Sequence, residues 1–291
     1  MNNSKENLES NYWLSLRKLI DDESPLVRSA LLAELRKHPK DGKLFLENII
    51  QNQKDILAKF ALSLIESLGW SDGVGNFLKF IRSQRYELES GCFLLDRTIF
   101  PTFEISSSTL FLDQLADRVR ELLTPPQNAR DICSVINRVF FHEFGFRGAT
   151  KDFADPKNSF LHLVLERKRG LPISLSVIYI LIARRVSLDL EPIGLPGRFM
   201  VGSFTDDQPF YIDVWSGGKF FDIDQMEEFL GNSELENSGS SLLPVTVAET
   251  LCRFCRNLVH QFGKAGEEKN AALFQRFVDE FEEVYHRETS A

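Results

Sequence analysis

The sequence predicts an α+β protein in which a small antiparallel sheet is covered by helices gathered on one side. Three observations support this class. Helical periodicity fills most of the chain on both sides of one central stretch. The segments with strand-like patterns all fall within a single window of roughly fifty residues. An almost wholly apolar helix, residues 174–186, directly precedes them and is the expected partner of the sheet.

The N-terminal region, residues 1–82, reads as a run of amphipathic helices. Within residues 20–39, Pro25 predicts a helix start and is followed by apolar side chains at helical spacing. Residues 54–70 repeat the pattern and end at Gly69, a predicted helix C-cap. The D-x-x-S-P-x-V-R-x-A pattern resembles the opening of a HEAT-type repeat. We expect a HEAT-like helical region here, either a small bundle packed on the next domain or a short peptide-binding solenoid.

A core domain is predicted over residues 83–235, and it begins with helices. Two lie within residues 85–123, separated by Pro101 and a serine run, and another covers residues 129–144. The apolar helix then leads into strands predicted at residues 190–197, 198–204 and 209–215, with a fourth short strand running into a helix.

A C-terminal helical segment is predicted over residues 242–291. A polar linker, residues 231–241, separates it from the core, and two helices follow between about residues 247 and 286.

Composition bounds the classes of function. The chain has 291 residues, of which 43% are hydrophobic, and a formal net charge of −8. Its pI near 5.3 argues against a nucleic-acid binder. No apolar run reaches the length of about 20 residues that spans a bilayer, and the first residues lack a signal-peptide pattern. We expect a cytoplasmic protein that binds neither nucleic acid nor membrane. The sequence does not indicate its oligomeric state.

Four cysteines are too sparse for a disulfide framework. Cys252 and Cys255 form a CxxC pair on a predicted helix, but a zinc site needs two further ligands and His260 is the only nearby candidate. We interpret the pair as ordinary buried thiols, with a metal or redox site as the alternative. Motifs for a metal or a nucleotide are missing from the sequence, so no cofactor is expected.

The chemically informative residues lie between residues 140 and 218. Serines open the apolar helix, and the next two strands carry Arg198 and Asp213. A nucleophile at a helix start, followed by strands with a proton-handling residue and an orienting carboxylate, is the layout of a thiol hydrolase. Here serine stands where cysteine is needed, and arginine where histidine is needed. The order of the elements is therefore that of a thiol hydrolase, but the residues at the two key positions are not those that the chemistry requires.

Four motifs in this stretch resemble the SirB-type branch of the transglutaminase-like superfamily. They are FHEFGFRG, DPKNSFLHLVLERKRGLPISLSVIY, GLPGRFMVG and YIDVWSGG. The resemblance covers roughly residues 85–262 and includes a core that also occurs in a eukaryotic F-box protein. The segment RFCRNL is similar to one that, in many members of the group, leads into tetratricopeptide-like (TPR-like) helices.

The resemblance implies a papain-like core with Cys at a helix N-terminus, then His and Asp on adjacent strands. Ser174 is the best match to the nucleophile position, and Ser176 is the alternative. The group commonly has G-H-F at the second position, so Arg198 departs from it; Asp213 matches the third.

Each candidate residue also has a structural interpretation. Ser174 could cap its helix while Arg198 and Asp213 form a salt bridge. Asn158 and Ser159 could form a turn and cap the next helix, or line a ligand-binding cleft. His162 could face the serines, although a hydrogen-bonded structural histidine is the commoner outcome.

The function expected from the sequence is that of a non-catalytic transglutaminase-like protein, a pseudoenzyme that binds a protein or peptide. Serine is a poor nucleophile without a base, and arginine cannot serve as that base. The alternative is a hydrolase or acyltransferase of the same fold that uses Ser174. The candidate binding residues are Asn158, Ser159, His162 and Ser176.

Overall fold

A computed structural model describes residues 12–52, 56–68, 70, 73–205, 208–231 and 242–289. The chain divides into two units: Met1–Gly73 with Arg97–Glu104, and Val74–Asp96 with Ile105–Ala291. The predicted C-cap at Gly69 lies outside the described residues, and so does the predicted linker at 231–241 except for its first residue.

Residues 12–17 of the first unit are helical and are followed by α2 (Pro25–Lys37), α3 (Pro39–Asn52) and α4 (Ile56–Ser67), whereas its residues 98–104 form turns and coil. Helix α2 begins at proline, as predicted, because the fixed φ of proline suits the first helical position. The apolar faces meet in one cluster that includes Leu16, Ile20, Leu31, Leu35, Leu46, Ile49, Ala61 and Leu64. Whether these helices form HEAT-type repeats stays a prediction.

The second unit opens with helices α5 (Gly73–Ser83), α6 (Leu88–Arg97), α7 (Ile105–Leu122) and α8 (Ala129–Asn137). The serine run predicted to break the chain lies inside α7, so that prediction is wrong. Short polar side chains suit a first helical turn, whose amides lack intrahelical partners. Helix α8 continues into a π-helical turn, η1 (Arg138–Glu143).

The predicted sheet is present and antiparallel. Its strands β3 (Glu191–Leu195), β4 (Arg198–Ser203), β5 (Phe210–Asp213) and β6 (Lys219–Phe221) lie in sequence order. Every one of its pairs is antiparallel. At the turn between β3 and β4, Gly197 has a φ of +68°, a backbone region that glycine enters at no steric cost.

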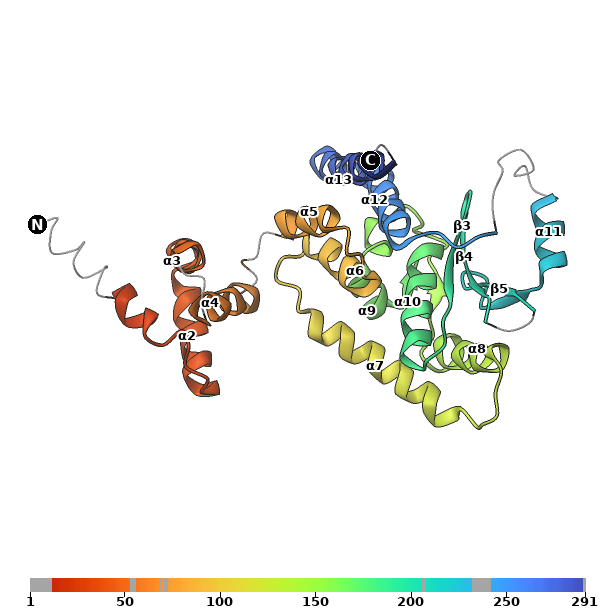
Figure 1. Ribbon diagram of the computed structural model, residues 1–291, viewed down its shortest axis with the longest axis horizontal. Coiled ribbons are helices and arrows are strands. Elements are labelled where there is room, and N and C mark those ends of the chain that lie inside the picture. Colours follow the sequence, from red (N-terminus) through yellow and green to blue (C-terminus); the bar gives the residue numbers. More distant parts are fainter. Residues whose placement is uncertain are drawn as a thin grey trace, which may run out of the picture. The chain divides into compact units, whose positions relative to one another are not determined.

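Helix α10 (Pro172–Arg185) is the centre of this unit. Each residue from Ile173 to Ala183 is buried, as its apolar sequence predicts. The helix lies alongside β3 and β4, which confirms the expected helix-on-sheet packing (Figure 1).

One pair of strands falls outside the predicted window. The strands β1 (Arg147–Gly148) and β2 (Arg169–Gly170) form a short parallel ladder. The prediction that all strands lie in one window is therefore wrong, because two-residue strands leave no alternation to detect. Between them lie η2 (Pro156–Asn158) and α9 (Leu161–Arg167).

Three helices follow the sheet: α11 (Ile223–Gly231), α12 (Val247–Lys264) and α13 (Glu268–Thr289). A capping box of Thr246 and Glu249 starts α12. Phe262 and Phe274 then stack across α12 and α13, with ring centroids 5.6 Å apart. Across the part of the chain that the structure describes, no helix combines the length and the apolarity needed to cross a bilayer.

Candidate functional site

Arg198 and Asp213 form the ion pair expected from their positions on neighbouring strands. Arg198 begins β4 and Asp213 ends β5, and Nη1 lies 2.7 Å from Oδ2. The carboxylate is 4% exposed, whereas the guanidinium is 44% exposed. Asp213 also accepts hydrogen bonds from the Ser216 amide (3.0 Å) and hydroxyl (2.8 Å). It therefore holds the turn after β5 as well as the arginine.

The Arg198 side chain is also held from the other side. Its guanidinium carbon lies 4.8 Å from the ring centroid of Phe229, which belongs to α11. Stacking on an aromatic face stabilises a guanidinium whose charge is permanent. The group is fixed in place and cannot accept a proton.

The two serines at the start of α10 donate their hydroxyl hydrogens to backbone carbonyls. Ser174 Oγ donates to Asn158 O at 2.6 Å, and Ser176 Oγ donates to Phe199 O at 3.3 Å. Both residues are fully buried. The prediction that Ser174 caps the helix is wrong: the cap position is Leu171, because Pro172 sets the helix start ahead of the serine.

Asn158 joins the D-P-x-N-S loop to α10. Its carbonyl accepts the Leu171 amide (3.2 Å) as well as the Ser174 hydroxyl, and its side chain donates to Asp152 O at 2.6 Å. Asp155 caps the short η2 turn by accepting the Lys157 amide. The loop is thus held by its own polar groups against the first turn of the helix.

Ser159 fastens the same loop to the C-terminal helices. Its hydroxyl donates to Gln261 Oε1 of α12 at 2.7 Å. The amide nitrogen of Gln261 in turn donates to Phe153 O (3.3 Å) and Asp155 O (3.2 Å). Ser159 and Gln261 are both buried, so this bridge is shielded from water.

The predicted cap of α9 by Asn158 or Ser159 is also wrong. The cap position is Phe160, and a carboxylate distant in the sequence satisfies the amides. Asp96 of α6 accepts the Leu161 amide at 3.0 Å and the His162 amide at 2.7 Å. A carboxylate at a helix N-terminus interacts favourably with the helix dipole.

Asp96 also pairs with the side chain of His162. Nδ1 of the imidazole lies 2.7 Å from Oδ2, and Asp96 is 1% exposed. Burial raises the pKa of Asp96, although the bonds from His162 oppose that shift. Sequence reasoning missed Asp96; the only signal was one acidic residue within the apolar run CFLLD.

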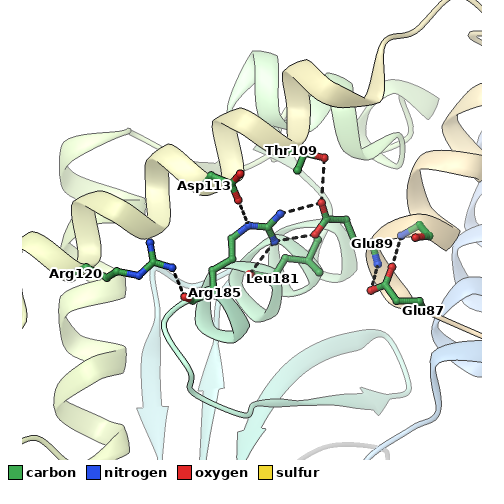
Figure 2. A network of polar contacts seen from close by, with 8 residues as sticks. Glu87, Glu89, Thr109, Asp113, Arg120, Leu181 and Arg185 are labelled. Carbon is green, nitrogen blue, oxygen red and sulfur yellow. Dashed lines mark hydrogen bonds and ion pairs between the residues drawn. The ribbon is translucent and has the colours of Figure 1, made fainter.

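Helix α10 is anchored at its other end by Arg185 (Figure 2). The guanidinium makes a 2.7 Å ion pair with Glu89 of α6 and another of 2.7 Å with Asp113 of α7. Arg120 of α7 donates to the Arg185 carbonyl oxygen. The helix that carries the serines is therefore fixed at both ends.

The four cysteines are buried and unbridged. Burial raises the pKa of Cys252 to about 11 and places the pKa values of Cys92 and Cys255 well above the usual range. These groups are thus thiols rather than nucleophilic thiolates at neutral pH. Within the described residues, no three His, Cys, Asp or Glu side chains are grouped so as to hold a metal ion.

The structure contains two open grooves that are not lined by any of the predicted site residues. One, of about 850 Å³, is in the first unit and is lined by Tyr12, Trp13, Leu14, Arg17, His38, Asp41, Leu44, Phe45, Asn48 and Ile49. The other, of about 580 Å³, runs along α7 and is lined by Leu110, Asp113, Gln114, Asp117, Arg118, Glu121, Glu143 and Phe144. Neither is lined by Ser174, Arg198 or Asp213.

Helix α10, the strands β3 to β6 and the Arg198–Asp213 ion pair all lie within one stretch of the sequence that matches a known family. Residues 108–256 match the sequence profile of the transglutaminase-like superfamily, and the chain belongs to that superfamily. No solved structure matches the chain.

Curated relatives include bacterial proteins named UPF0162. One from Xylella fastidiosa (strain Temecula1) is 30% identical over 193 residues, which cover 63% of this chain and 67% of the relative. The UPF0162 protein of Vibrio cholerae is 24% identical over 132 residues, 45% of this chain and 49% of that protein. F-box only protein 21 of Mus musculus is 26% identical over 162 residues, 53% of this chain and 25% of that protein. The chain thus spans between a quarter and two thirds of these proteins.

Proposed function

We propose that the chain is a non-catalytic, SirB-type member of the transglutaminase-like superfamily that acts in the cytoplasm by binding another protein or a peptide. The branch assignment rests on the FHEFGFRG, DPKNS and GLPISLS motifs. The similarity to F-box only protein 21 involves a quarter of that longer protein. The matched quarter supports the idea that this part of the chain acts as a module that can also occur within larger proteins.

One observation carries the non-catalytic part of the proposal: the burial of Ser174. A serine nucleophile needs a neighbouring base and a path for the substrate. The Ser174 hydroxyl is fully buried and is committed to a carbonyl oxygen 2.6 Å away, which is not a base. Arg198, at the position of the proton acceptor, stays protonated in its pair with Asp213.

The aromatic groove of the first unit supports the binding role. Trp13 and Phe45 lie in its wall with ring centroids 4.9 Å apart, and Leu44 on its rim is 68% exposed. Concave surfaces lined by apolar and aromatic side chains are typical of ligand sites and of grooves that bind peptides.

Activity-based labelling tests the non-catalytic assignment. A fluorophosphonate probe and an iodoacetamide probe are added to the native protein, to Ser174→Ala, and to Ser203→Ala as a matched buried-serine control. We expect no labelling of any of the three. Strong labelling that survives in Ser203→Ala and disappears in Ser174→Ala would instead establish the hydrolase or acyltransferase alternative.

A pair of surface variants tests the binding role. Leu44→Arg places a charge on the groove rim, and Leu26→Arg does the same at an 80% exposed position of α2 that does not line the groove. We expect Leu44→Arg to lose a protein captured from cell extract that Leu26→Arg retains. If both variants captured the protein equally, the groove would not be the binding site.

A further inference from the structure

The β1–β2 ladder places two arginines side by side. Arg147 and Arg169 are partners in the parallel register and are both exposed. Neighbouring strands lie about 4.8 Å apart, so two positive charges are held close together. Like charges directly opposite each other destabilise a sheet, so a bound anion between these two arginines would remove an unfavourable interaction.

The glycines of the same ladder show which way the arginines project. A Cβ on Gly148 would lie 2.8 Å from the Trp215 ring, and one on Gly170 would lie 2.7 Å from the Val164 side chain. Successive residues of a strand point to opposite faces. The glycines therefore face the packed interior, and Arg147 and Arg169 face away from it.

No carboxylate of the described chain lies within ion-pair distance of either arginine. This is unusual in a chain with a net charge of −8. Most arginines that make side-chain bonds elsewhere in the described residues have an acidic partner, as Arg185 and Arg198 do.

Both guanidinium groups are instead held by backbone carbonyls through a single nitrogen each. Nη1 of Arg147 donates to Phe141 O and Phe146 O. Nη1 of Arg169 donates to Gly145 O (3.1 Å) and Lys168 O (3.0 Å). These hydrogen bonds hold both guanidinium groups against the backbone between residues 141 and 146. The remaining N–H donors of each fork are the ones that bind a carboxylate in a bidentate pair.

A third cation adjoins the pair. Lys168 precedes Arg169, and its ammonium lies 5.7 Å from the ring centroid of Phe144. Its φ of +56° is that of the left-handed residue that ends α9, where its amide donates to Val164 O at 2.8 Å.

We propose that Arg147, Lys168 and Arg169, the basic ladder, bind an acidic segment of a partner protein. Two pre-positioned guanidinium forks and an ammonium match the carboxylates of consecutive Asp or Glu side chains in charge and geometry. The net charge of −8 repels any long polyanion, so the anion that binds must be short enough to contact the basic ladder alone, as two or three adjacent carboxylates of a peptide are. The proposal rests on the binding role above and names the chemistry of the partner.

Fluorescence anisotropy with a labelled octaglutamate peptide tests the proposal, and octaglutamine serves as the uncharged probe. The proteins are the native chain, Arg147→Gln/Arg169→Gln, and a control, Lys269→Gln/Arg276→Gln, which removes two exposed cations of α13. We expect octaglutamate to bind and octaglutamine not to bind. The variant that lacks both ladder arginines should bind octaglutamate about 25-fold more weakly, or about fivefold for each arginine, and binding should fall as salt rises from about 50 to 150 mM.

The control variant separates a site from general charge. Binding by Lys269→Gln/Arg276→Gln like that of the native chain, with weaker binding by the ladder variant, supports the proposal. Equal binding by the two variants, no binding by the native chain, or binding of inorganic phosphate in place of octaglutamate would overturn it. None of these outcomes bears on probe labelling at Ser174 or on capture through the groove of the first unit, so failure of this proposal can be told apart from failure of the proposed function. Thermal unfolding of each variant confirms that the comparison is between folded proteins.

Discussion

Replacing Asp96 by alanine should destabilise the second unit by about 3 kcal/mol. The side chain caps α9 by accepting two backbone amides, and it also accepts a hydrogen bond from His162. Loss of a helix cap costs about 1 kcal/mol, and loss of a hydrogen bond to a buried charged group costs about 1.5–3 kcal/mol. The sum of these two costs is an upper limit, because the structure around residue 96 can relax and water can hydrogen-bond to the exposed amides. Asp96→Asn keeps one acceptor oxygen and should cost about half as much.

Urea unfolding followed by far-ultraviolet circular dichroism and by tryptophan fluorescence measures this change. The matched control is Asp113→Ala, which removes a helix carboxylate paired with Arg185 at the same 2.7 Å but 51% exposed. Exposed pairs contribute at most about 1 kcal/mol, so the two variants should differ clearly. Equal losses of stability, or a loss below about 1 kcal/mol for Asp96→Ala, would refute the argument that burial decides the cost.

Four further outcomes follow from the site. Arg198→Ala should lower the free energy of unfolding by about 1–2 kcal/mol in urea titrations, less than for a fully buried pair, because the guanidinium is 44% exposed; an unchanged midpoint would contradict this. Cys252, with its pKa raised to about 11, should resist iodoacetamide at neutral pH until the chain unfolds, and mass spectrometry would detect early modification. Burial raises the pKa of Asp96 above its usual 3.8, so the folded state binds that proton more tightly. The stability of the native chain relative to Asp96→Asn should therefore be greatest at low pH and decline as pH rises from 3.8 through the folded-state pKa, and a rise over that window would show the sign to be wrong. The double variant Ser174→Cys/Arg198→His should hydrolyse no model ester, since residue 174 is fully buried; measurable turnover would show that the site opens.

The sequence predicts features that depend on local pattern. The burial of α10 follows from its apolar run, and the pairing of Arg198 with Asp213 follows from their places on consecutive strands. Both rest on periodicity and short loops, which act over a few residues. The order of the sheet follows for the same reason, because consecutive antiparallel strands pair with their neighbours.

The polar contacts that hold the site together are not predictable in this way. Asp96 reaches Leu161 across 65 positions, and Ser159 reaches Gln261 across 102. Neither contact produces a periodic pattern in the sequence, because each joins single side chains that only tertiary packing brings together. The position of Ser174 differs from the prediction for a local reason: Pro172 starts the helix two residues earlier, so Ser174 lies inside the helix and is buried.

The hydrogen bonds of Gln261 show that the folding unit extends beyond the segment that is similar in sequence to the superfamily. The superfamily match ends at residue 256, before this glutamine, yet its side chain closes the loop that begins at Phe153. A fragment cut at residue 256 would leave the Ser159 hydroxyl and two carbonyls without their partner, and it would take the Phe262 ring away from the buried ring of Phe160. Helices α12 and α13 therefore cannot be exchanged between relatives as an independent appendage unless the recipient loop is exchanged with them.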